Sequence, residues 1–81
     1  MHLEILTPDN KVFSGEVTSV NLPGTNGYFE VLVNHAPLIS TLEKGAIKIK
    51  GAGVDKNITV DGGMVEVLNN KVIVLAESVL A

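Results

Sequence analysis

The clearest structural signal in this sequence is the segment MVEVLNNKVIVLA, residues 64–76. Two apolar runs flank the pair Asn69-Asn70 in the middle of the segment. Asparagine tolerates the left-handed backbone conformation that a two-residue hairpin turn requires. The segment is therefore predicted to form an antiparallel β-hairpin.

The second strand of this hairpin is apolar on both of its faces. Alternate side chains of a strand point to opposite sides, and here one side carries Val72, Val74 and Ala76 while the other carries Ile73 and Leu75. Both faces of this strand should therefore be covered. Either it lies centrally in a sandwich, or its outer face meets another protein.

Short extended segments separated by turn residues account for the rest of the chain. They cover residues 1–6, 11–22, 28–33, 38–43, 46–50 and 58–60. Turns are predicted at Thr7–Asn10, Pro23–Gly27, Lys44-Gly45 and Asp61–Gly63, a long polar connection at residues 51–57, and a bulge or corner at Ser14-Gly15. We expect an all-β fold, a single flattened β-sandwich over residues 1–81 with about eight to ten short antiparallel strands and no substantial helix.

Composition supports one small folded domain. The 81 residues are 46% hydrophobic and 19% charged, with twelve valines and six isoleucines, which favour strands over helices. With no cysteine the chain has no disulfide, and a domain of this size buries a limited share of its surface. We therefore expect modest stability alone and a contribution from a partner.

Charge and hydrophobicity exclude two kinds of partner. Six lysines, no arginine, a net charge of −3 and three aromatic residues argue against nucleic acid, which calls for a basic patch and stacking rings. No apolar run approaches the roughly 20 residues that cross a bilayer, so we expect a soluble chain that is not inserted in a membrane.

The sequence contains no recognised catalytic, cofactor-binding or metal-binding motif, so no residue is predicted for any of these roles and no cofactor is expected. His2 beside Glu4 is interpreted as an exposed strand residue. His35, before Ala36-Pro37, either fixes the turn by bonding to local backbone or contacts a partner. One chemical alternative is a lipoyl or biotinyl carrier domain that is modified at Lys56.

Several blocks of the sequence, in this order and spacing, resemble the N-terminal domain of the epsilon subunit of F-type ATP synthases. The blocks are NHAPLISTL at residues 34–42, Lys44-Gly45, DGGMVEV at 61–67 and VIVLAE at 72–77. The resemblance implies a flattened ten-stranded sandwich without an active site. It implies a central-stalk rotor subunit that docks the gamma subunit onto the membrane c-ring and couples proton flow to ATP synthesis. Its expected location is the cytoplasmic face of the bacterial inner membrane, peripheral, with the thylakoid stromal face as the alternative.

The resemblance also implies two contact surfaces. The gamma side comprises His35, Ala36, Pro37, Leu38, Thr41 and Leu42, and the c-ring side comprises Gly24, Asn26, Gly27, Tyr28 and Glu30. The sequence departs from the family where Glu30, Val33 and Asn34 replace Gly, Pro and Gly. It also stops at Ala81, where the family commonly continues into a helical hairpin that binds nucleotide and inhibits ATP hydrolysis, so we expect coupling without that latch.

Overall fold

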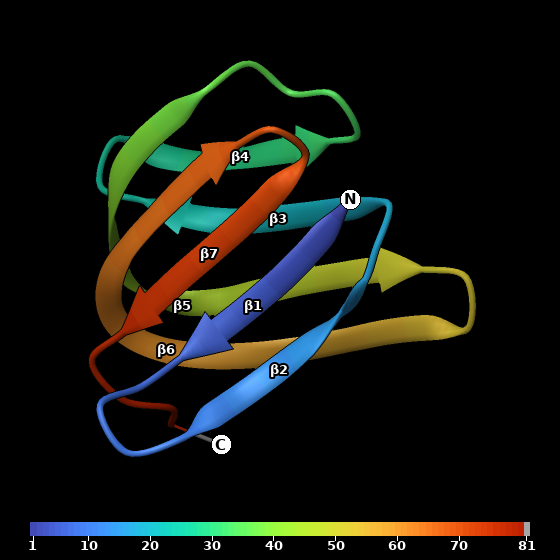
Figure 1. The fold of residues 1–81 in the computed structure, drawn as a ribbon. Helices are drawn as coiled ribbons and strands as arrows, with labels where there is room; N and C mark the ends of the chain where they lie inside the picture. Colours follow the sequence, from blue (N-terminus) through green and yellow to red (C-terminus); the bar gives the residue numbers. More distant parts are fainter. Residues whose placement is uncertain (81) are drawn as a thin grey trace.

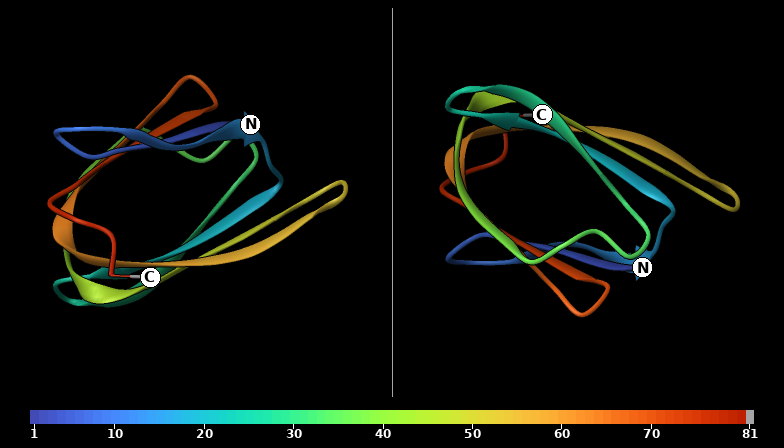
Figure 2. Two further views of the ribbon diagram at one scale, coloured as in Figure 1. Left: turned by 90° about the horizontal axis from the view of Figure 1, so that it is seen from below. Right: turned by 90° about the horizontal axis from the view of Figure 1, so that it is seen from above.

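One mixed sheet, folded over on itself into two layers, makes up the computed structural model, which describes residues 1–80 (Figures 1 and 2). The sheet order is β2-β1-β7-β6-β5-β3-β4. No helix is present in the described part of the chain, and hence none that could cross a membrane. The strands are β1 (His2–Leu6), β2 (Lys11–Glu16), β3 (Ser19–Gly24), β4 (Gly27–Leu32), β5 (Leu38–Gly51), β6 (Val54–Leu68) and β7 (Lys71–Ala76).

The two long strands β5 and β6 belong to both layers. They pair without a register break from Leu38 opposite Val67 to Gly51 opposite Val54. The amino-terminal part of β5 and the carboxyl-terminal part of β6 lie in a layer with β7, β1 and β2, which faces the viewer in Figure 1. The remaining parts lie in the second layer with β3 and β4. The bent hairpin therefore connects the two layers by continuous hydrogen bonding.

Glycine makes the bend in β6 possible. Gly62 and Gly63 have φ values of 94° and 145°, which side-chain-bearing residues rarely adopt. A Cβ atom on Gly63 would overlap the Leu75 carbonyl oxygen and lie 2.9 Å from the Ala76 Cα. The backbone of β7 thus passes directly over Gly63, and only a residue without a side chain fits there.

The core consists of the inward-facing alternate residues of both layers. All of them are apolar, and every buried residue with a large side chain is Leu, Ile or Val. This composition agrees with the preference of branched side chains for a pleated surface. The core residues are Leu3, Ile5, Val17, Val20, Leu22, Val31, Leu42, Ile47, Ile49, Val60, Val65, Val67, Val72, Val74 and Ala76.

The all-β class and the sandwich are confirmed, but the strands are seven rather than eight to ten. The reason is that two predicted turns, Lys44-Gly45 and Asp61–Gly63, lie inside β5 and β6, where the strands bend without losing their pairing. Antiparallel pairing throughout was the expectation, whereas β1 and β7 run parallel. The predicted connection at residues 51–57 is a tight turn at Ala52-Gly53, because β6 already begins at Val54.

Two further local predictions have different outcomes. The Asn69-Asn70 turn is confirmed, with φ values of 51° and 60°. The bulge was predicted at Ser14-Gly15, but these two residues pair in regular register with β1. The register instead shifts between Ile5 and Leu6, and the extra residue on β2 is Val12. The bulge thus lies next to the Thr7–Asn10 turn, and a bulge of this kind increases the local twist.

Replacement of Gly63 by alanine tests the bend. We expect Gly63→Ala to lower the free energy of unfolding by about 2 to 4 kcal/mol, because it combines backbone strain with overpacking. Gly53→Ala is the matched control, since Gly53 also has a positive φ but nothing lies within 4 Å of its added Cβ. That control should lose only about 1 to 2 kcal/mol. Equal losses in urea denaturation would contradict the crowding at Gly63.

Candidate functional site

A continuous apolar surface covers the outer side of the layer that contains β5, β6 and β7. Exposed fractions are 68% for Ile39, 48% for Leu75, 47% for Leu68 and 40% for Met64, while Ile73 is half-buried. Register brings these side chains together, because Met64 pairs with Leu75, and Ile39 and Ile73 both lie opposite Glu66. We call these five apolar residues and Glu66 the apolar face.

The apolar face excludes one of the two explanations for the doubly apolar strand β7, namely that the sandwich itself covers both of its sides. Its inner residues Val72 and Val74 are fully buried in the core, whereas its outer residue Leu75 is about half exposed. The strand is therefore covered on one side only. A contiguous apolar patch on the surface of a small domain typically marks an interaction site.

The predicted gamma-side residues lie in the β4–β5 loop and the first part of β5. Ala36, Pro37 and Thr41 are exposed, and Thr41 is paired with Met64 on the apolar face. His35 and Leu38 are half-buried. Leu42 is only 5% exposed and belongs to the core, so its side chain offers no contact surface. Ile39, Met64 and Leu68 were not among the predicted residues, whereas Leu75 had been noted on the second apolar side of β7.

His35 lies in a loop that is fixed by hydrogen bonds. Its Nδ1 donates to the Ala36 carbonyl at 2.7 Å, and its backbone N–H donates to the Leu32 carbonyl at 3.1 Å. Next to it, the Asn34 N–H donates to Asn70 Oδ1 at 2.6 Å and Asn70 Nδ2 donates to Asn34 Oδ1 at 2.8 Å. The hydrogen bond between His35 and local backbone agrees with the interpretation that this residue fixes the turn. The bonds between Asn34 and Asn70 hold the loop against the β6–β7 turn.

The predicted c-ring residues form the β3–β4 hairpin. Asn26, Gly27, Tyr28 and Glu30 are exposed, whereas Gly24 is buried under the hairpin. The Tyr28 hydroxyl accepts a hydrogen bond from the Ala46 N–H at 3.1 Å, and this contact holds the ring across β5. The turn predicted at Pro23–Gly27 is shorter in the structure, where it comprises only Thr25 and Asn26.

Hydrogen bonds connect the two predicted surfaces. The Thr25 N–H donates to the Thr41 carbonyl at 3.2 Å, and the two threonine hydroxyls lie 3.0 Å apart. Thr25 is in the β3–β4 turn and Thr41 is in β5, beside Met64. The hairpin and the apolar face are therefore neighbours, joined by backbone and side-chain hydrogen bonds.

A polar cluster surrounds His2 on β1 and β2. Its Nδ1 lies 3.0 Å from Glu16 Oε2, its Nε2 lies 3.5 Å from Ser14 Oγ, and the terminal ammonium lies 3.4 Å from Glu16 Oε1. His2 was predicted to be an exposed strand residue, but it is half-buried, and Glu16 lies closer to its ring than Glu4 does, at 3.0 Å against 3.6 Å. The serine–histidine–carboxylate order does not make a nucleophile, because the 3.5 Å contact is long and the Glu16 side chain is 75% exposed on a flat strand surface.

The hydrogen bond from His2 lowers the pKa of the Glu16 carboxyl below its ordinary value of 4.5, and the terminal ammonium adds to the effect. Among residues 1–80, no group of three His, Cys, Asp or Glu side chains is arranged to hold a metal ion. The His2 cluster is thus a surface ion-pair network that fastens β2 to β1.

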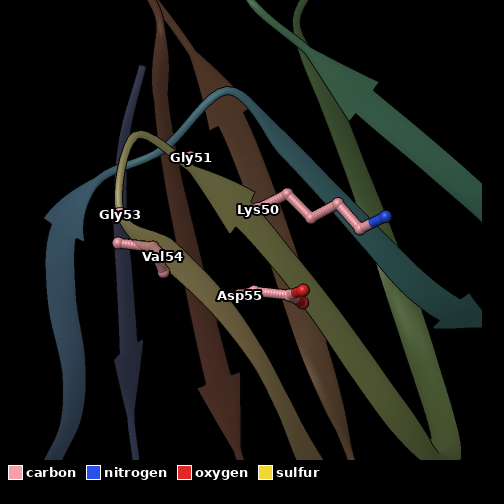
Figure 3. Close-up of a pocket in the computed structure, with 5 residues that line it drawn as sticks. All are labelled: Lys50, Gly51, Gly53, Val54 and Asp55. Atoms are coloured by element: carbon pink, nitrogen blue, oxygen red, sulfur yellow. The ribbon is translucent and has the colours of Figure 1, made fainter.

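The position of Lys56 is inconsistent with the carrier-domain alternative. Lys56 lies within β6 rather than at a hairpin tip, and its Nζ lies 5.8 Å from the centre of the Phe13 ring, a cation–π distance. The tip itself is Ala52-Gly53, next to an open depression lined by Lys50, Gly51, Gly53, Val54 and Asp55 (Figure 3). A modified lysine needs an exposed turn, so the prediction for Lys56 is wrong.

Comparison with known proteins gives one consistent result. The family model described as "ATP synthase, Delta/Epsilon chain, beta-sandwich domain" matches residues 1–81. The ATP synthase epsilon chain of Nitratidesulfovibrio vulgaris strain Miyazaki F is 49% identical over 78 residues, which are 96% of this chain and 58% of that relative. The epsilon chain of Chlorobium limicola is 41% identical over 95% of this chain and 89% of its own length. The chain thus spans little more than half of the first relative.

Solved structures share the fold. A chain of the Tetrahymena thermophila mitochondrial ATP synthase, from a structure of the central stalk and c-ring, matches with a TM-score of 0.84 at 14% identity, over 98% of this chain and 64% of that one. A chain of the Euglena gracilis mitochondrial ATP synthase matches with a TM-score of 0.88 at 18% identity, over 96% of this chain and 51% of that one. At these identities the likeness concerns the fold.

The lowered pKa of Glu16 predicts a pH dependence of stability. The pKa of Glu16 is lower in the folded than in the unfolded chain, so the carboxylate contributes its full stabilisation at pH values above the unfolded-state pKa. This contribution is lost as the pH falls through the folded-state pKa. Glu16→Gln should therefore be less stable than the parent chain near neutral pH, with the difference shrinking below pH 4.5. Thermal unfolding at a series of pH values measures it. Glu43→Gln, an exposed carboxylate on β5, is the control, and an equal pH dependence there would contradict the assignment.

Proposed function

Because this chain belongs to the β-sandwich family of ATP synthase delta and epsilon chains, we propose that it acts as a non-catalytic subunit of the central-stalk rotor of an F-type ATP synthase. In this role it docks the gamma subunit onto the c-ring and couples proton flow to ATP synthesis. It would be peripheral to the membrane, on the cytoplasmic face in a bacterium. The observation that carries the proposal is the exposed apolar face, which a subunit built for docking requires.

The apolar face supports the assignment of the gamma side. It adjoins the β4–β5 loop and includes Ile39, which lies within the predicted segment His35–Leu42. Stable protein interfaces bury roughly 1,000 Å² or more, with apolar anchors at the centre and a polar rim. Exposed Ile39 and Leu75 are such anchors. Covering them would also stabilise a chain whose own core is small.

The c-ring side is supported by the position of the β3–β4 hairpin. Its exposed residues Asn26, Tyr28 and Glu30 are polar or aromatic, and Tyr28 is anchored to the backbone of β5. The Thr25–Thr41 bonds connect this hairpin to the strand that carries Ile39. A rotor element must not shear, and close-packed β layers joined in this way resist deformation.

Co-purification tests the proposed function. The tagged chain should retain a gamma subunit and a c-ring when membranes of its source are solubilised in mild detergent. Ile39→Asp should lose the gamma subunit, because a charge on a 68% exposed anchor opposes docking without disturbing the core. Asn57→Asp, on the exposed outer side of the opposite layer, should behave like the parent chain. Capture of neither subunit by the parent chain would refute the rotor assignment.

The two methionines provide a footprint of the docked surface. The side chain of Met1 is 1% exposed and that of Met64, on the apolar face, is 40% exposed. Dilute hydrogen peroxide should therefore convert Met64 to the sulfoxide several-fold faster than Met1 in the free chain. Gamma subunit should slow the oxidation of Met64 and leave that of Met1 unchanged, as read by peptide mass spectrometry. Unchanged Met64 oxidation in a proven complex would place the interface elsewhere.

A further inference from the structure

We infer that the subunit that covers the apolar face presents a lysine or arginine side chain to Glu66. This inference rests on the proposed function, because it specifies the chemistry of the partner at the surface that the proposal assigns to docking. It follows from the position of one carboxylate in an otherwise apolar patch.

Glu66 is enclosed by apolar neighbours on its own side of the sheet. Ile39 on β5 and Ile73 on β7 lie directly opposite it across the two neighbouring strands. Met64 and Leu68 precede and follow it along β6 on the same side. All four nearest positions on this surface are therefore apolar, and the carboxylate is at the centre of the apolar face rather than on its rim.

The Glu66 side chain is exposed to solvent and has no polar partner among residues 1–80. Within residues 1–80, no ion pair and no side-chain hydrogen bond involves Glu66. Two shallow depressions border it, one lined by Pro37, Ile39 and Leu68 and the other by Leu68, Lys71 and Ile73. A partner that covers Ile39 and Leu68 must enter these depressions and displace the solvent.

Removal of water from an unpaired carboxylate costs far more than the neighbouring apolar contacts recover. A cation brought into hydrogen-bond contact offsets this cost, and charge-assisted hydrogen bonds between such groups are short and strong. The apolar surroundings lower the local dielectric once the face is covered, which strengthens the attraction. The face thus selects a partner that is apolar around one positive charge.

Lys71 is a cation of this chain that lines a depression together with Glu66. However, it lies opposite Leu68 rather than Glu66, and no ion pair joins Lys71 to Glu66. Glu4, on the far side of Ile73, lies 3.7 Å from Lys11 Nζ and 3.6 Å from His2 Nε2, whereas Glu66 has no such partner. Substitution of Lys71 therefore distinguishes a counter-ion within this chain from one that the partner supplies.

The experiment measures binding of the 81-residue chain to the purified gamma subunit from the same source, at low and high salt. Glu66→Gln should weaken binding by at least about tenfold, because the partner's cation is left buried without its counter-ion, and it should reduce the salt dependence. Glu66→Leu should weaken binding as well, for the same reason. Asp55→Asn, which removes a carboxylate from the opposite layer, should change neither quantity.

Each result decides the inference. Unchanged or tighter binding by Glu66→Gln and Glu66→Leu would show that no cation faces Glu66 and would overturn it. Loss of affinity in Lys71→Met equal to that in Glu66→Gln would assign the counter-ion to this chain and would also overturn it. If the parent chain binds and only Ile39→Asp does not, the proposed function stands while the inference on Glu66 fails. If the parent chain does not bind gamma, both fail.

Discussion

The unbroken pairing of β5 with β6 around a bend is the constraint on which the rest of this structure depends. Buried backbone groups must be hydrogen-bonded. A long hairpin that bends keeps its strands paired from one layer to the other, so that the backbone groups on either side of the bend keep their partners. The bend relies on Gly62 and Gly63, whose positive φ values and missing side chains let the backbone of β7 pass close by. Both layers, and therefore the buried core between them, are aligned by this hairpin.

The same arrangement leaves an apolar surface without a cover. With the inner residues of β6 and β7 filling the core, their outer residues Met64, Leu68 and Leu75 project into water beside Ile39. Within residues 1–80 no further strand or helix lies over them. The proposed docking would explain this surplus of apolar side chains, and the inference on Glu66 concerns the one carboxylate among them.

Part of the candidate site followed from the sequence. Hydrogen bonds and exposure place the β4–β5 loop and the β3–β4 hairpin at the surface as predicted, although Leu42 and Gly24 are buried. Ile39 and Leu68 escaped notice because side-chain alternation shows on which side of a strand a residue lies but not whether that side is buried. The pairing of His2 with Glu16 was also missed, since it depends on the register between β1 and β2.

The sequence by itself determined the strand-forming composition, the Asn69-Asn70 turn and the apolar character of both sides of β7, because backbone preferences and side-chain alternation are local properties. Only the tertiary structure decided that Lys44-Gly45 and Asp61–Gly63 are bends within strands, that β1 runs parallel to β7, and that Glu66 lies among four apolar neighbours. These features depend on which strands pair and in what register. Contacts between residues distant in the chain settle both, and no local pattern records them.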